Sequence, residues 1–274
     1  MKNSLSQSIR KLTFLSKAGS AEKYKPTEND VYLVSYPRSG NTWMRVIMSE
    51  LLYHKSGDSI EELQNYVPDI HQPIFTKDLI KSNFHVIKSH YPYVVNNNIK
   101  NRASVKNYKK VVYIVRDPRD ILISHYKYLN NFRYSINFDK FIWDWITGRI
   151  WPCSWQEHVN SWIGMGYENI GVEIELIKYE DLLLNPEPEI MKLSTIMGIQ
   201  FTSEDVQRAL QAAAVEKMRS KETKGMPRHE RQEKAQFIGE ATNKQWLEKL
   251  TAEQLNLIEE YLGHTMKRCG YTVN

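Results

Sequence analysis

Several features of secreted, membrane and metal-binding proteins are missing from this sequence of 274 residues. Its two cysteines, Cys153 and Cys269, are too few for a disulfide framework and lack metal-ligand spacing with the 8 histidines. No run of about 18 apolar residues is present, which excludes a membrane-spanning helix, and no apolar core of a signal peptide follows the first residues. These absences predict a protein of a reducing, cytoplasmic compartment.

Acidic residues are also missing from the start of the chain, where the first one is Glu22. The segment before it carries four cations and four apolar residues at helical spacing: Lys2, Arg10, Lys11 and Lys17 with Leu5, Ile9, Leu12 and Leu15. Such a segment either makes a weak contact with a membrane surface or forms a terminal helix that frays or docks locally. We therefore separate residues 1–25, a basic segment with helical potential, from residues 26–274.

The composition of the chain is that of a globular protein. Hydrophobic residues make up 41% and charged residues 25%, both close to the usual values. A chain of this length buries about three quarters of its unfolded surface, so a full core is available. No internal repeat or linker divides residues 26–274, which are predicted to form one domain.

The stretch Tyr36–Trp43, named here the anion loop, lies between an apolar run of strand length and a run of helical spacing. Free backbone N–H groups in a turn containing Gly40, and the dipole of the helix that follows, both favour negative charge. Side-chain donors are added by Arg38, Ser39, Asn41 and Thr42. The loop is predicted to bind a phosphate, although an ordinary turn between a core strand and a core helix has the same pattern.

The anion loop does not contain the pattern of P-loop nucleotide triphosphatases, in which four residues separate two glycines and Lys and Ser or Thr follow. A P-loop-type nucleotide kinase is therefore disfavoured, but it remains one alternative. A non-catalytic nucleotide- or nucleic-acid-binding protein is a second alternative, because the net charge of +5 suits a polyanionic partner.

Further strands are predicted over residues 84–88, 111–115 and 172–179, with helical patterns between them. This alternation predicts an α/β fold: a single domain with a central parallel sheet flanked by helices and a P-loop-like nucleotide-binding architecture. Ligands of such sheets lie outside the carboxyl ends of the strands. Lys88 ends the second strand, His90 lies just beyond it and Arg116 follows the third strand, so we expect them to lie near Arg38.

Capping patterns predict where several helices begin. Ser154 with Glu157 and Thr251 with Gln254 are predicted to form capping boxes, and Asp58 is predicted to cap a short helix. A further helix is predicted from Ser203 to about Met218.

Five motifs resemble, in order and spacing, those of the cytosolic-type sulfotransferases that depend on 3′-phosphoadenylyl sulfate (PAPS). They are the anion loop, Lys88-Ser89-His90, residues 112–117 with Ser124, Ser154-Trp155 with His158-Val159 and Trp162, and Tyr179-Glu180-Asp181-Leu182 with Asn185-Pro186. The first three resemble the 5′-phosphosulfate loop, the Lys-Thr-His that contains the general base, and the 3′-phosphate motif of that family. The resemblance covers roughly residues 31–186.

The resemblance implies transfer of a sulfuryl group from PAPS to a hydroxyl or amine of a small-molecule acceptor, without a metal; the donor leaves as adenosine 3′,5′-bisphosphate. It implies His90 as general base, with Lys88 and Arg38 as catalytic cations. The residues implied to bind the donor are Arg38, Ser39, Gly40, Asn41, Thr42, Trp43, Arg116, Ser124 and Tyr179. No nucleic-acid partner is implied, and the oligomeric state is left open.

Beyond residue 186 the resemblance weakens. The family's Arg-Lys-Gly segment before a Gly-Asp-Trp keeps only Trp246, and Ala213-Ala214-Val215 stands where Thr-Ser-Phe is frequent beside the adenine. The charged stretch Arg219–Lys234 is predicted to be a mobile basic loop that closes over the donor or acceptor as a lid. Aromatic residues between positions 132 and 162 suit a flat or lipid-like alcohol, and the basic stretch suits an acidic or carbohydrate acceptor, so the acceptor class stays open.

Overall fold

The structure is a computed structural model that describes residues 22–93, 108–130, 136–164, 171–224 and 243–273. Most of the basic segment predicted for residues 1–25 lies outside these ranges. The same holds for residues 225–234 of the predicted lid.

A four-stranded parallel sheet forms the centre of the fold. Its strands lie in the order β2 (Val86–Ser89), β1 (Val31–Ser35), β3 (Lys110–Val115) and β4 (Glu173–Lys178). All three pairings are parallel, so the carboxyl ends of the strands meet at one edge. The predicted α/β class and the single domain with a parallel sheet are confirmed.

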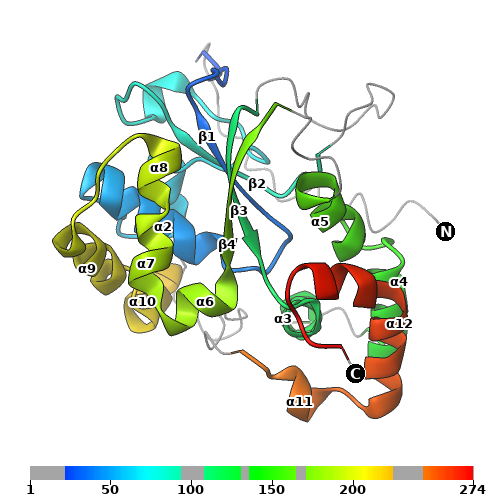
Figure 1. Ribbon diagram of the computed structural model, residues 1–274. Coiled ribbons are helices and arrows are strands. Elements are labelled where there is room, and N and C mark those ends of the chain that lie inside the picture. The colour runs from blue at the N-terminus through cyan, green and yellow to red at the C-terminus, as the bar shows by residue number, and fades with distance from the viewer. Residues whose placement is uncertain (1–21, 94–107, 131–135, 165–170, 225–242, 274) are drawn as a thin grey trace.

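Helices cover both faces of this sheet (Figure 1). One face carries α2 (Asn41–Tyr53), α6 (Tyr179–Leu184), α7 (Pro186–Met191), α8 (Leu193–Met197), α9 (Ser203–Ala212) and α10 (Val215–Lys224). The other carries α3 (Pro118–Asn130), α4 (Phe138–Ile146), α5 (Trp155–Ile163) and α12 (Ala252–Arg268). Short helical turns, η2 (Glu61–Asn65), η3 (Thr76–Asp78) and α11 (Trp246–Lys249), lie in the connections.

Alternation along the strands divides the core into two layers. Val31 and Leu33 of β1 pack with the helices around α2, whereas Tyr32 and Val34 pack with the aromatic side of the sheet. This division follows from the two-residue period of a strand, which points successive side chains to opposite faces. Most of the aromatic residues of α4 and α5 belong to the core, and three tryptophans among them are fully buried: Trp145, Trp155 and Trp162.

Both predicted capping boxes are confirmed, at Ser154 with Glu157 and at Thr251 with Gln254. The predicted cap at Asp58 is wrong. The 3₁₀ turn begins at Glu61, and the carboxylate of Glu62 reaches back to the backbone N–H of Asp58, so Asp58 lies outside the turn.

The helix predicted from residue 203 to 218 is divided in two. It breaks at Ala213, whose carbonyl oxygen accepts a hydrogen bond from the Trp43 indole. The prediction of a loop from Arg219 is also wrong for its first six residues, because α10 continues to Lys224. Lys221 anchors this helix by donating to the carbonyl oxygens of Ser56 and Gly57, a contact distant in sequence that periodicity does not reveal.

A buried ionic network joins α3 to α12. The Arg119 side chain of α3 is only 2% exposed and pairs with Asp117 at 2.8 Å and with Glu259 of α12 at 3.1 Å. Its guanidinium also lies 3.8 Å from the centroid of the Trp246 ring. Arg119 therefore connects α3, α12 and α11.

Arg119→Ala is expected to lower the free energy of unfolding by about 3–5 kcal/mol, because two buried carboxylates lose their cation. Lys140→Ala is the matched control, since it removes an exposed pair with Asp144 that contributes about 1 kcal/mol or less. Urea unfolding of the two variants measures the difference. Equal losses would show that the buried network does not stabilise the fold.

Candidate active site

The anion loop bends sharply between β1 and α2. Arg38 and Gly40 have φ angles of 72° and 91°, both in the left-handed region, and α2 then begins at Asn41 without a side-chain cap. Its first-turn N–H groups are therefore not satisfied by a capping side chain. Ser39 Oγ is buried and has no hydrogen-bond partner in the described part of the chain. The arrangement suits an anion.

Tyr179, the first residue of α6, packs directly on this loop. A Cβ atom built at Gly40 would lie 2.6 Å from Cδ2 of the Tyr179 ring, so only glycine allows the approach. The guanidinium carbon of Arg116 lies 4.2 Å from the centroid of the same ring. Tyr179 thereby brings the end of β4 to the loop and to the end of β3.

Two arginines and a serine meet beside the anion loop. Arg38 Nε donates to Ser124 Oγ of α3 at 3.2 Å, and Arg116 Nη1 donates to the Arg38 carbonyl oxygen at 3.1 Å. The Arg38 guanidinium also lies 4.9 Å from the centroid of the Tyr128 ring. Burial lowers the pKa of Arg38 to about 10, so it stays a cation at neutral pH. The site therefore concentrates positive charge and hydroxyl groups.

His90 occupies the neighbouring strand end in a defined tautomer. Its Nδ1 lies 2.7 Å from the Ser35 carbonyl oxygen, which can only accept, so Nδ1 carries the proton and Nε2 holds a lone pair. Burial, and then the charge of Lys88, hold the pKa of His90 well below its usual value. His90 is therefore a neutral base at physiological pH.

Hydrogen bonds connect His90 to the anion loop through Ser35. Asn41 Nδ2 donates to Ser35 Oγ at 3.1 Å, and this Oγ lies 3.5 Å from His90 Nδ1. Lys88 is oriented differently, because its Nζ pairs with Asp69 Oδ2 at 2.6 Å. The sequence-predicted residues thus form two adjoining groups, one around Arg38 and one around His90.

The last two predicted donor-binding residues lie in the first turn of α2. Thr42 and Trp43 are both half-buried. The Trp43 indole donates to the Ala213 carbonyl oxygen at 3.1 Å, and its ring centroid lies 6.0 Å from that of Tyr179. Ala213 belongs to the segment in which the family's adenine-side residues are replaced.

The segment after residue 242 docks at the start of α3. The Asp120 carboxylate accepts from the backbone N–H groups of Lys244 at 2.6 Å and Trp246 at 3.3 Å. Trp246, the residue kept from the family's C-terminal pattern, is thereby fixed near the end of β3. The segment that would replace Arg-Lys-Gly lies in residues 225–242, outside the described ranges.

Three residues of the site were missed from the sequence: Asp69, His71 and Tyr128. Asp69 and His71 lie in a stretch between two prolines with no regular period, so no local signal distinguished them. Tyr128 lies four residues after Ser124 on α3, and the one-turn spacing of a helix was the signal that would have found it.

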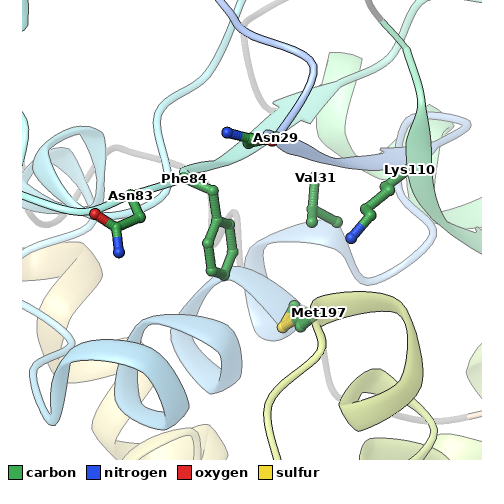
Figure 2. Close-up of a pocket in the computed structure, with 6 residues that line it drawn as sticks. All are labelled: Asn29, Val31, Asn83, Phe84, Lys110 and Met197. Atoms are coloured by element: carbon green, nitrogen blue, oxygen red, sulfur yellow. The ribbon is translucent and has the colours of Figure 1, made fainter.

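A surface hollow of about 200 Å³ lies at the opposite edge of the sheet. Figure 2 shows the residues that line it: Asn29, Val31, Asn83, Phe84, Lys110 and Met197. Val31 and Lys110 are the first residues of β1 and β3, so the hollow faces the amino ends of the strands. It is distant from the loops described above and does not belong to this site.

The sequence profile of the sulfotransferase domain matches residues 28–270, which is most of the chain. The chain belongs to the sulfotransferase family. The two alternatives left open by the sequence, a nucleotide kinase and a non-catalytic binder, are thereby set aside.

Individual relatives of this sulfotransferase agree with the assignment. It is 28% identical to flavonol 3-sulfotransferase of Flaveria bidentis over 90% of this chain and 86% of the relative. It is 25% identical to amine sulfotransferase of Oryctolagus cuniculus over 72% of this chain and 65% of the relative.

Solved structures show the same fold. A mouse sulfotransferase in complex with PAP superposes with a TM-score of 0.65 at 18% identity, covering 89% of this chain and 85% of its own. Retinol dehydratase in complex with androsterone and inactive cofactor PAP gives 0.67 at 18% identity, covering 89% and 82%.

The described residues of the sulfotransferase contain neither a membrane-spanning helix nor a cluster of metal ligands. None of the helices there combines the length and apolar character needed to cross a membrane. No group of three or more His, Cys, Asp or Glu side chains gathers there in a way that would hold a metal ion. A reaction without a metal remains a prediction from the family resemblance.

Gly40→Ala is expected to lower the free energy of unfolding by about 1–3 kcal/mol more than Gly198→Ala. Both glycines have left-handed φ angles, but an added Cβ meets the Tyr179 ring only at Gly40 and has nothing within 4 Å at Gly198. Chemical denaturation measures both variants. If the two lose equal stability, Tyr179 does not restrict the loop.

Proposed function

We propose that this sulfotransferase transfers a sulfuryl group from PAPS to a hydroxyl or amine of a small-molecule acceptor. The observation that carries the proposal is the tautomer of His90, whose basic Nε2 lies on a residue tied through Ser35 to the anion loop. The PAP in two structural neighbours and the names of the flavonol and amine sulfotransferases support the choice of donor and acceptor groups.

The residues of the anion loop suit the 5′-phosphosulfate of PAPS. The backbone N–H groups at the start of α2, with Ser39 and Thr42, would hold this group, because they offer hydrogen bonds and the first turn contains no acidic residue.

The remaining predicted residues would bind the other parts of the nucleotide. Arg116 and Ser124 would bind the 3′-phosphate. Aromatic surface for the adenine is provided by Trp43 and Tyr179. Gly40 and Asn41 complete the loop, Gly40 by its conformation and Asn41 through Ser35.

In the reaction, the acceptor oxygen or nitrogen forms a bond to sulfur while the bond between sulfur and the bridging phosphate oxygen breaks. His90 Nε2 takes the acceptor proton, and the electron pair of the breaking bond stays on the phosphate of adenosine 3′,5′-bisphosphate. Arg38 and Lys88 would stabilise the charge that develops on this leaving oxygen. Fixed cations lower the barrier here for the same reason as in phosphoryl transfer.

We propose residues 26–274 as the catalytic domain. The class of acceptor is to be identified with the whole protein. The His90 ring contacts the rings of His71 and of Trp151, which is half exposed, and the Tyr91 ring packs on His71. Radiolabelled PAPS should be incubated with alcohols, phenols, amines and saccharides. Label transfer to at least one class is expected, and transfer to none would contradict the proposed function.

His90→Ala is expected to lower turnover by about 10²- to 10⁴-fold while nucleotide binding persists, because only the proton acceptor is lost. Exposed His264→Ala on α12 is the control and should retain activity. Near wild-type turnover of His90→Ala would exclude His90 as the base.

The pH dependence of the wild-type enzyme reports the same residue. The lowered pKa of His90 keeps its side chain neutral as the pH falls, so the acid limb of kcat/KM should lie below pH 6.5.

Arg116→Ala is expected to reduce the preference for adenosine 3′,5′-bisphosphate over adenosine 5′-phosphate by about 10- to 100-fold. A charge-assisted hydrogen bond to the 3′-phosphate contributes about 1.5–3 kcal/mol, which sets this range. Calorimetry with both nucleotides measures the ratio, and Arg268→Ala on α12 should leave it unchanged. A ratio that does not change in Arg116→Ala would show that Arg116 does not read the 3′-phosphate.

A further inference from the structure

Asp69 is a buried carboxylate next to the predicted catalytic residues, and neither the motifs nor the comparisons give it a role. It lies in the connection between η2 and η3, where Gln64 fixes its backbone. Gln64 Oε1 accepts from the Asp69 N–H at 2.9 Å, and Gln64 Nε2 donates to the Asp69 carbonyl oxygen at 3.4 Å. The backbone of Asp69 is thus held in one place.

One carboxylate oxygen of Asp69 holds Lys88. The two residues face each other across a parallel β-bridge. In this bridge the Lys88 N–H donates to the Pro68 carbonyl oxygen, and the Ile70 N–H donates to the Lys88 carbonyl oxygen. Their side chains meet at 2.6 Å, and each side chain is only 12% exposed. The shielded geometry favours a single position of the lysine Nζ.

The other carboxylate oxygen of Asp69 is linked to the backbone of His90 by two hydrogen bonds that pass through His71. Asp69 Oδ1 accepts from the His71 backbone N–H at 3.0 Å, and His71 Nε2 accepts from the His90 backbone N–H at 2.9 Å. Because Nε2 accepts, His71 is neutral at this nitrogen, in agreement with burial that lowers the pKa of His71 to about 4. The rings of His71 and His90 are stacked, with centroids 5.8 Å apart.

We propose that Asp69 is a positioning residue for sulfuryl transfer, which sets Lys88 through Oδ2 and the backbone of His90 through Oδ1 and His71. This inference rests on the roles proposed above for Lys88 and His90. One acidic side chain thereby aligns the cation and the base of the reaction, which lie two residues apart on β2 and its continuation.

Because cations surround Asp69, a substitution there should affect the position of Lys88 and the affinity for the nucleotide in different ways. Arg45 is buried nearby and donates to the Val67 carbonyl oxygen, so Lys88 and Arg45 place two cations around one carboxylate. Replacing Asp69 by Asn removes a negative charge but retains an oxygen for the His71 N–H. The site then becomes more positive, so it should bind an anionic nucleotide equally well or more tightly, while Lys88 is no longer fixed.

Asp69→Asn is therefore expected to lower kcat by about 10- to 100-fold, the size of effect that a misplacement of about 1 Å produces. The Kd for adenosine 3′,5′-bisphosphate should stay within about twofold or fall. Turnover is measured with radiolabelled PAPS and the best acceptor of the panel described above, and binding by calorimetry. A kcat within twofold of wild type, or a loss of nucleotide affinity equal to the loss of kcat, would overturn the proposal.

A matched control is Glu189→Gln, which removes a carboxylate that also pairs with a lysine at 2.6 Å but lies on α7. Its kcat should remain at the wild-type level. If Asp69→Asn does not fold, His71→Phe is the second variant. It keeps an aromatic ring but loses the acceptor for the His90 N–H, so kcat should fall with nucleotide affinity retained, and unchanged kcat would again overturn the proposal.

The experiment also distinguishes the two levels of inference. If Lys88→Ala and His90→Ala lose turnover and Asp69→Asn does not, only the positioning role of Asp69 fails. If Lys88→Ala and His90→Ala retain turnover, the proposed function of the site fails independently of Asp69.

Discussion

Parallel pairing of β1 with β2 on one side and β3 on the other is the constraint on which the site depends. The register places Val34 of β1 opposite Ser89 of β2, so the next residue, His90, comes level with Ser35 and reaches its carbonyl oxygen. On the other side, Ser35 lies opposite Ile114, and Arg116 emerges beside the anion loop. A register shift by one residue would turn these side chains to the wrong faces.

Buried cations dominate the electrostatics of this edge, and the fold compensates them in different ways. Arg38 and Arg116 place their guanidinium groups over the rings of Tyr128 and Tyr179, which attract cations through the negative face of the ring. Lys88 instead has a carboxylate, Asp69. The ion pair limits where the Lys88 Nζ can move.

Much of the architecture could be predicted from the sequence because local rules govern it. A continuous apolar run indicates a strand buried on both faces, and Ser or Thr followed by Glu or Gln indicates a helix start, as at Ser154 and Thr251. The same rules failed at Asp58 and at Ala213. There, contacts made by Glu62 and Trp43 decided where the helical turns begin and end.

The sequence by itself determined the order of strands and helices along the chain, the loop containing Gly40 between the first strand and its helix, and the presence of cations and a histidine at strand ends. These depend on neighbouring residues, so short patterns express them. Only the tertiary structure decided that Lys88 pairs with Asp69, that His71 accepts from His90, and that Tyr179 packs on the anion loop. Such contacts join segments 19 to more than 100 residues apart, and no local pattern encodes a distance set by sheet register and helix packing.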